Sequence, residues 1–309
     1  MVLRTDPFTG YDQYLRRTNL TVLQGSAPIL QHTNAFDLAG RLLVVGDTAG
    51  HSATYSYLAD SALVGQIRFQ QGSTLRMTTA KQYDPLNRLT ALSSTVGQAP
   101  SFAAFAYVYN RANQRVRRSE ADGSYWRYGY DSLGQVTSGK KYWPDQTPVA
   151  GQQFEYAFDD IGNRVSAKAG GDDRGAGLRS ASYSANLLNQ YSSRTVPGAV
   201  DVMGMALATN SVTVNGQSVY RKGEYFRKEL SVNNASSPVW QQVDVAAPNE
   251  TTVTRHEFVA KTPETFTHDA DGNLTQDGRW LYTWDGENRL VGMSSANTNP
   301  AVGPQQWVE

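Results

Sequence analysis

The chain has 309 residues, with 28 Lys or Arg balanced by 28 Asp or Glu, and it contains no cysteine. The zero formal net charge offers no broad field to attract nucleic acid or anionic lipid, and the missing cysteine excludes disulfides, cysteine-based zinc sites and thiol nucleophiles. Seventeen Tyr, 27 Gly and a mean hydropathy of −0.49 favour short strands and turns, so the sequence predicts an all-β fold.

The first ten residues contain Arg4, Asp6 and Pro7 and no apolar run. We therefore expect no signal peptide here, and no membrane insertion by this chain. An export signal for the parent protein would lie elsewhere.

One seven-residue pattern recurs along the chain: an aromatic residue, Asp, two variable residues, Gly or Asn, a polar residue and an aliphatic residue. The segment from Tyr83 to Leu89, YDPLNRL, is typical. Clear copies, some with a variant first residue or one added residue, begin at Phe36, Tyr83, Tyr109, Tyr130, Phe158, His268 and Trp284, and weaker ones at Tyr57 and Tyr183. A spacing of about 25 residues is typical of a two-stranded repeat.

The pattern describes a β-hairpin turn. Asp at the first turn position accepts backbone hydrogen bonds, and Gly or Asn at the fourth tolerates the left-handed conformation. A type I turn followed by a left-handed residue makes a three-residue loop with a bulge, which places Tyr83 opposite Leu89 and pairs Asp84 with Arg88. The predicted structural turn residues are Asp37, Gly40, Asp84, Asn87, Asp131, Gly134, Asp159, Gly162, Asp269, Gly272, Asp285 and Asn288.

Strands that lead into these turns alternate aromatic residues with a period of two, which is strong evidence for β-structure. The triplets are Phe105, Tyr107 and Tyr109; Trp126, Tyr128 and Tyr130; Phe154, Tyr156 and Phe158; Trp280, Tyr282 and Trp284. We expect a packing ladder on one sheet face, with Arg127, Glu155 and Thr283 on the other; a ligand-stacking platform is the less favoured reading.

The repeat rhythm lapses between Tyr183 and His268. Four short strands, at 211–219, 225–230, 239–245 and 251–259, predict a small inserted β-sandwich-like module. The expected organisation is a repeat strip over residues 1–196, the insert over 197–262, and final repeats with a tail over 263–309. For the insert, a structural role in packing is favoured over the binding of a glycan or a partner. The Gly-rich segment 170–177 is expected to be a flexible loop.

No catalytic constellation is present. The four histidines form no metal-binding spacing, and Gly50-His51-Ser52 has no nucleophile-elbow context. The stretch beginning at Asp269 resembles a calcium loop, but Leu274 and Trp280 stand where an EF-hand needs Gly and Glu. We therefore predict no catalytic residue, no cofactor and no metal, and expect that the chain is not an enzyme.

The repeated pattern resembles the YD repeats of the Rhs proteins, toxin-complex C subunits and teneurins, over roughly residues 36–191 and 266–291. This resemblance implies a β-hairpin strip wound as a curved, partial shell. In bacterial relatives the shell encloses a C-terminal toxin, and in teneurins it belongs to an adhesion receptor.

The resemblance thus implies a non-catalytic scaffold, a segment of a longer bacterial protein that is secreted or displayed at the cell surface. Its partners would be the rest of the shell or the toxin cargo. The alternative is an extracellular adhesion module that binds a cell-surface glycan or protein. No nucleic-acid partner is expected in either case.

Overall fold

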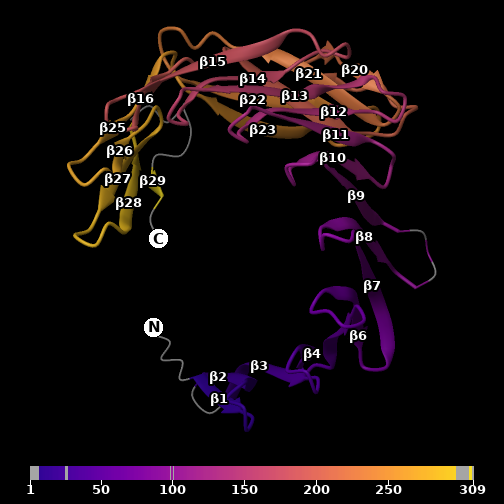
Figure 1. The fold of residues 1–309 in the computed structure, drawn as a ribbon. Coiled ribbons are helices and arrows are strands. Elements are labelled where there is room, and N and C mark those ends of the chain that lie inside the picture. The colour runs from indigo at the N-terminus through magenta and orange to yellow at the C-terminus, as the bar shows by residue number, and fades with distance from the viewer. Residues whose placement is uncertain (1–6, 25–26, 98, 100, 297–305, 308–309) are drawn as a thin grey trace. The chain divides into compact units, whose positions relative to one another are not determined.

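The computed structural model describes residues 7–24, 27–97, 99, 101–296 and 306–307, and all their regular structure is β-strand (Figure 1). The predicted all-β class is confirmed. Within the described ranges, no helix is long and apolar enough to cross a membrane. The expectation of no signal peptide concerns residues 1–10, of which 1–6 lie outside the described part. Two compact units divide the chain, 1–126 and 127–309, with strand β11 (Tyr125–Tyr130) at their boundary.

The first unit is a meander of antiparallel hairpins, in which each strand pairs with the next one along the chain. Its strands are β1 (Pro7–Tyr11), β2 (Arg17–Gln24), β3 (Ala27–Phe36), β4 (Leu42–Asp47), β5 (His51–Tyr57), β6 (Val64–Gln71), β7 (Thr74–Tyr83), β8 (Leu89–Thr95), β9 (Ala103–Tyr109) and β10 (Arg115–Glu120). Such local pairing is usual for consecutive strands that are joined by short turns.

The second unit continues the same arrangement through β12 (Val136–Tyr142), β13 (Pro148–Phe158), β14 (Arg164–Gly170), β15 (Leu178–Ala185) and β16 (Tyr191–Arg194). Strand β16 then pairs with β24 (Glu264–Thr265), although about 70 residues separate them. The chain ends in a second sheet of β25 (Thr267–His268), β26 (Leu274–Gln276), β27 (Trp280–Trp284), β28 (Leu290–Ser295) and β29 (Gln306–Trp307).

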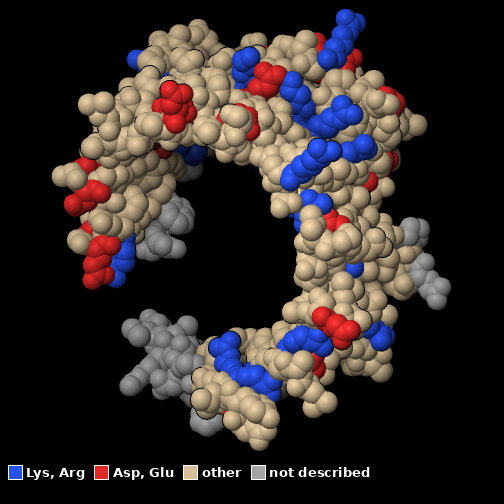
Figure 2. Space-filling view, viewed as in Figure 1, with Lys and Arg blue, Asp and Glu red and all other residues tan. Residues whose placement is uncertain are grey.

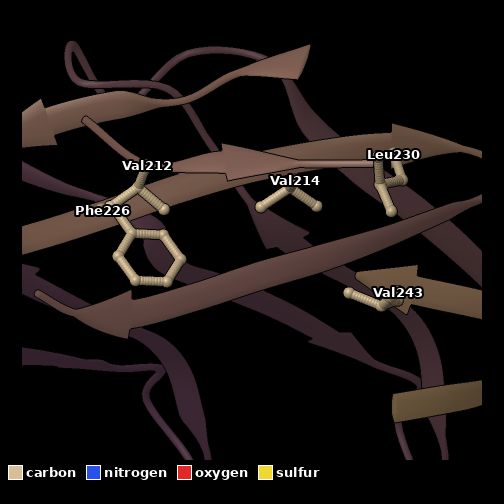
Figure 3. Packing of buried hydrophobic residues seen from close by; sticks show 5 residues of the cluster. All are labelled: Val212, Val214, Phe226, Leu230 and Val243. Carbon is tan, nitrogen blue, oxygen red and sulfur yellow. The ribbon is translucent and has the colours of Figure 1, made fainter. Parts of the chain in front are cut away.

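Residues between β16 and β24 form two small sheets packed on each other. One sheet has the order β17 (Ala199–Met205), β21 (Tyr225–Ser231), β20 (Tyr220–Lys222), and the other β19 (Gln217–Ser218), β18 (Thr213–Val214), β22 (Val239–Ala246), β23 (Val253–Val259). Their facing side chains form a closed apolar cluster of Val212, Val214, Phe226, Leu230 and Val243, each at most 7% exposed (Figure 3). The insert is therefore a β-sandwich with its own core.

The structure corrects the predicted strands of the insert. Residues 211–219 do not form one strand; they form the β18–β19 hairpin, because Asn215 and Gly216 both have positive φ and turn the chain. Strand β17, which pairs with β21 over seven residues, was not predicted. The proposed boundaries at 196/197 and 262/263 both fall inside the second compact unit.

Two further expectations concern the turns. Segment 170–177, expected to be a flexible loop, connects β14 to β15 and contains a hydrogen-bonded turn, in which the Asp172 carboxylate accepts the backbone N–H groups of Arg174 and Ala176 at 2.9 Å. The weak repeat placed at Tyr183 is shifted: Asn186 takes the Asp position of the turn, and Asn189 the left-handed position.

Candidate functional site

The turn at Asp84 shows how the repeated pattern folds. Asp84 Oδ1 accepts hydrogen bonds from the backbone N–H groups of Leu86 and Arg88, both at 3.0 Å, and its Oδ2 accepts one from Arg88 Nε at 2.6 Å. Asn87 has a φ of 61°, and the register pairs Tyr83 with Leu89 across a bulge. One carboxylate thus both closes the backbone turn and holds the arginine side chain in place.

The predicted turn residues form six hairpin turns, each with one Asp and one Gly or Asn. These turns are distributed along the chain and do not form one site. The left-handed positions have φ values of 81° at Gly40, 61° at Asn87, 85° at Gly134, 94° at Gly162, 91° at Gly272 and 59° at Asn288. In each turn, the Asp carboxylate accepts a hydrogen bond from the backbone N–H of the residue four positions later. This holds for Asp37, Asp84, Asp131, Asp159, Asp269 and Asp285.

Hydrogen bonding lowers the pKa of the carboxyl groups of Asp37, Asp84, Asp159, Asp269 and Asp285. Partial burial raises the pKa of Asp84, but the backbone N–H and guanidinium of Arg88 and the N–H of Leu86 outweigh it, so the net change is downward from 3.8. At Asp269 the amide of Asn273 is the largest cause, and it lowers the pKa in the same direction. The turns are therefore held by ionised carboxylates at neutral pH.

In three turns, the arginine four residues after the Asp also contacts the neighbouring hairpin. Guanidinium carbons lie over aromatic rings about 20 residues later: Arg16 over Phe36 at 4.5 Å, Arg41 over Tyr57 at 4.2 Å and Arg88 over Tyr109 at 5.0 Å. Each guanidinium is thereby held between its own Asp and the aromatic residue that opens the next turn. Such cation–π contacts are worth roughly 0.5–1 kcal/mol each when exposed.

Tyrosines that open turns also reach back to the preceding hairpin through their hydroxyl groups. Tyr57 donates to the carbonyl of Leu42 at 2.6 Å, Tyr83 to that of Val64 at 3.0 Å, and Tyr109 to that of Leu89 at 2.8 Å. In each case the tyrosine ends one strand and the acceptor begins the strand paired with it. We call this row of Asp, Arg and Tyr side chains the turn edge.

Sequence reasoning missed these contacts between hairpins. The expected role of Asp84 and Arg88 stopped at their own turn, and the aromatic residues were assigned to a packing face alone. Arg117 and Arg118 are likewise half-buried and lie over Tyr125 at 3.9 Å and Phe105 at 5.6 Å. Two features of the sequence could have indicated contacts between hairpins. One is an Arg four residues after the Asp, and the other is a tyrosine at a position where phenylalanine would pack equally well.

The insert is bound to the strip at a second cluster of contacts. The buried hydroxyl of Tyr225 donates to the carbonyl of Ala150 at 2.5 Å, and the Tyr225 ring packs edge-on against Trp143, with ring centroids 5.5 Å apart. Burial raises the pKa of Tyr225 to about 12. Lys222 Nζ donates to Asp145 Oδ2 at 2.6 Å at the rim. The sandwich is thus packed firmly against β12 and β13.

An ion-pair cluster reinforces this contact. Asp201 of β17 binds the guanidinium groups of Arg179 from β15 and Arg227 from β21, and Glu229 binds the same two arginines. The Arg227 and Asp201 side chains are only 11% and 13% exposed, so both charges depend on their partners. Elsewhere, acidic and basic side chains are interspersed on the viewed surface (Figure 2).

Among the residues that the structure describes, no group of three or more His, Asp or Glu side chains could hold a metal ion. The Asp269 turn uses its carboxylate on its own backbone and on Asn273. His51 pairs with Asp47 at 2.8 Å on the surface and forms part of a turn.

Residues 109–142 match the family model described as RHS Repeat. This segment holds the turns at Asn110 and Asp131 and the strands around them. Residues 109–142 thus carry an Rhs repeat, and the predicted resemblance to the Rhs/YD-repeat proteins is confirmed over this segment. A search of curated proteins found no match.

Several solved structures are similar over most of the chain. The structure of TcdB2-TccC3 without its hypervariable C-terminal region matches at 10% identity, over 98% of this chain and 21% of that one, with a TM-score of 0.37. Another TcdB2-TccC3 structure matches at 11% identity, over 96% and 23%, with a TM-score of 0.28. A porin-like protein from Bacteroides uniformis matches at 9% identity, over 73% and 94%, with a TM-score of 0.26.

These TM-scores are too low to establish a shared fold. The chain spans about a fifth of the length of the TcdB2-TccC3 chains that it matches.

Proposed function

We propose that this Rhs-repeat chain is a non-catalytic structural scaffold, one segment of a shell wall built from β-hairpins. The observation that carries the proposal is the turn edge, where Arg88 and Tyr109 connect one hairpin to the next. A wall that encloses a cargo needs every hairpin to be coupled to its neighbour, because a two-stranded hairpin alone is marginally stable.

The scaffold would act within a longer protein, exported or displayed at the cell surface, whose C-terminal segment is the toxin cargo. The remaining repeats and that cargo would be the partners of this chain. The insert would brace the wall, since Tyr225 and the Asp201 cluster hold it against strands of the strip. We propose the boundaries 197 and 262 for this brace.

Protease protection tests the scaffold function. In the longer gene product that contains this segment, the residues downstream of it should resist a protease that degrades them when they are expressed alone. A Tyr109→Phe, Arg88→Gln double variant should lose protection more readily on mild heating, whereas Tyr55→Phe should not. Equal digestion of the downstream segment with and without the repeats would contradict the proposal.

The second candidate is an adhesion module that recognises a glycan or protein through the insert. It is favoured by β23, whose residues from Val253 to Glu257 are all exposed. Strand β16 pairs directly with β24, so a short linker could replace residues 197–262 without separating them. Selective signals on a glycan array that vanish with this deletion would favour adhesion, and an array without selective signals would count against it.

A further inference from the structure

A cavity of about 620 Å³ lies in the second unit, where three parts of the chain meet. The end of the strip contributes Arg194, the insert contributes Phe258, and the terminal hairpins contribute Asp277, Arg279 and Trp280. Cavities of this volume are in the range that holds small organic ligands. The turn edge and the contact of the insert with β12 and β13 leave this cavity without a role.

Arg279 is the unusual residue of the cavity wall. Its guanidinium carbon lies 4.8 Å from the ring centroid of Trp280, 5.0 Å from that of Phe258 and 5.2 Å from that of Trp240. Its Nε is buried with no hydrogen-bond partner. Within the described part of the chain, no carboxylate lies within ion-pair distance of Arg279, whereas Arg179 and Arg194 of the same wall are both paired.

Two acidic groups of the cavity wall, Asp277 and Glu264, are already engaged. Asp277 Oδ1 accepts the backbone N–H groups of Arg279 and Trp280, both at 2.7 Å, and Asp277 Oδ2 accepts the hydroxyl of Tyr282 at 2.7 Å. Glu264, which is 6% exposed, binds Arg194 and the backbone N–H of Gly278. Arg279 therefore lines the cavity without an internal ion-pair partner, although the exposed Glu257 belongs to the same wall.

The charge of the wall limits the ligand. Four carboxylates, of Asp201, Glu257, Glu264 and Asp277, stand against three guanidinium groups. This surplus of one negative charge opposes a doubly charged phosphate more strongly than a singly charged anion. A carboxylate also matches the planar fork of a guanidinium. We propose that the cavity binds a monocarboxylic acid of the size of a sugar acid, with its carboxylate on Arg279.

Tryptophan fluorescence of the whole chain tests this site, because Trp240 and Trp280 both lie beside Arg279. Galacturonate and glucuronate are the probes, and methyl galacturonate and galactose are their uncharged analogues. We expect saturable changes with the two acids, none with the neutral sugars, and weaker binding of inorganic phosphate. Arg279→Gln should weaken binding of the acids at least about tenfold, since a charge-assisted hydrogen bond is lost.

Arg255→Gln is the matched control, because Arg255 is an exposed arginine on β23 outside the cavity wall; its binding should be unchanged. Equal binding of galacturonate and its methyl ester to the wild-type chain would overturn the proposal. This comparison needs no variant, so it still holds if circular dichroism shows that Arg279→Gln does not fold. Wild-type binding that survives in a folded Arg279→Gln chain would also overturn it, as would the lack of a saturable response to either acid at millimolar concentration.

Discussion

The hydroxyl of Tyr109 donates a 2.8 Å hydrogen bond to the backbone carbonyl of Leu89, 20 residues earlier in the chain. Tyr109 ends β9 and Leu89 begins β8, so the bond ties two adjacent turns at one edge of the sheet. Arg88, next to the acceptor, lies over the ring of the same tyrosine. One side chain thus provides both a polar and a cation–π contact between successive hairpins.

Removing only that hydroxyl should weaken the chain measurably. Tyr109→Phe keeps the ring under Arg88 but leaves the Leu89 carbonyl without this donor, so we expect the free energy of unfolding to fall by about 1 kcal/mol. Urea denaturation followed by circular dichroism measures the change. Tyr55→Phe is the control, because Tyr55 has no side-chain hydrogen bond among the described residues. Equal losses in the two variants would refute the role of the hydroxyl.

Leu15 occupies the left-handed position of an additional turn that the sequence pattern did not predict. Its φ is 59° and its side chain is 83% exposed, while the Asp12 carboxylate makes the same turn contacts as in other repeats. A left-handed conformation costs a residue with a Cβ roughly 1–2 kcal/mol, and Asn tolerates it better. We expect Leu15→Asn to raise the free energy of unfolding by up to about 1 kcal/mol.

Leu86→Asn is the control for that substitution, because Leu86 is also exposed in a turn but lacks a positive φ. It should leave stability unchanged within about 0.5 kcal/mol. If Leu86→Asn stabilised the chain as much as Leu15→Asn, the gain would come from removing exposed apolar surface and not from relief of backbone strain.

A β-branched residue at Gly134 should have the opposite effect. Gly134 has a φ of 85°, a conformation that valine adopts only at high cost. Gly134→Val should therefore lower the free energy of unfolding by about 1–3 kcal/mol. Gly286→Val provides the comparison, because Gly286 has no positive φ and no heavy atom near its added Cβ. An unchanged melting temperature for Gly134→Val would disprove the turn geometry at this repeat.

Stability should depend on pH through the turn carboxylates. The folded pKa of Asp84 is lowered from 3.8, so its contribution is present above the unfolded value and is lost as the pH falls through the folded value. We expect the free energy of unfolding to be nearly constant above about pH 5 and to decrease below about pH 4. Urea denaturation at several pH values from about pH 5 down to about pH 3 measures how steeply the free energy of unfolding falls with pH.

Asp84→Asn should reduce that slope, since Asn110 shows that an amide can cap the same turn: its Oδ1 accepts the N–H groups of Ala112 and Gln114. The variant should lose some stability at pH 7, where the wild-type carboxylate pairs with Arg88. An identical pH dependence in wild type and variant would show that Asp84 does not contribute to acid unfolding.

Local structure was readable from the sequence, and contacts between hairpins were not. The pairing of Tyr83 with Leu89 and the bond between Asp84 and Arg88 follow from residues within one turn, whose chemistry is complete in a few positions. The contact of Arg88 with Tyr109 depends on which strand lies alongside, so no short pattern contains it. Composition predicted a loop at the Gly-rich stretch around Asp172, but not that its carboxylate would close a turn of the same kind.

The insert shows the same limit on a larger scale. Its strands from Tyr225 onward were predicted, whereas β17, in which Asp201 and Gly204 interrupt the apolar residues, was not. Asp201 is explained only by Arg179 and Arg227, from two other strands. Polar residues that serve a tertiary ion-pair cluster look like loop residues when the cluster is unknown.

The entry of the chain into the insert offers the last prediction. Gly198 precedes β17, and its carbonyl accepts the backbone N–H of Val232 at 2.8 Å. A Cβ at Gly198 would lie 2.3 Å from the carbonyl oxygen of Val232, a backbone atom that cannot rotate away. Gly198→Ala should therefore displace β17 from β21 and lower the free energy of unfolding by about 1–3 kcal/mol.

Gly292→Ala is the matched control, because its Cβ would meet only Thr283, at an ordinary 3.6 Å. Hydrogen exchange would locate the damage: amides from Ala199 to Met205 should lose protection in Gly198→Ala, and those of β28 should keep it. Retained protection across β17 would show that its pairing with β21 differs from the register described above.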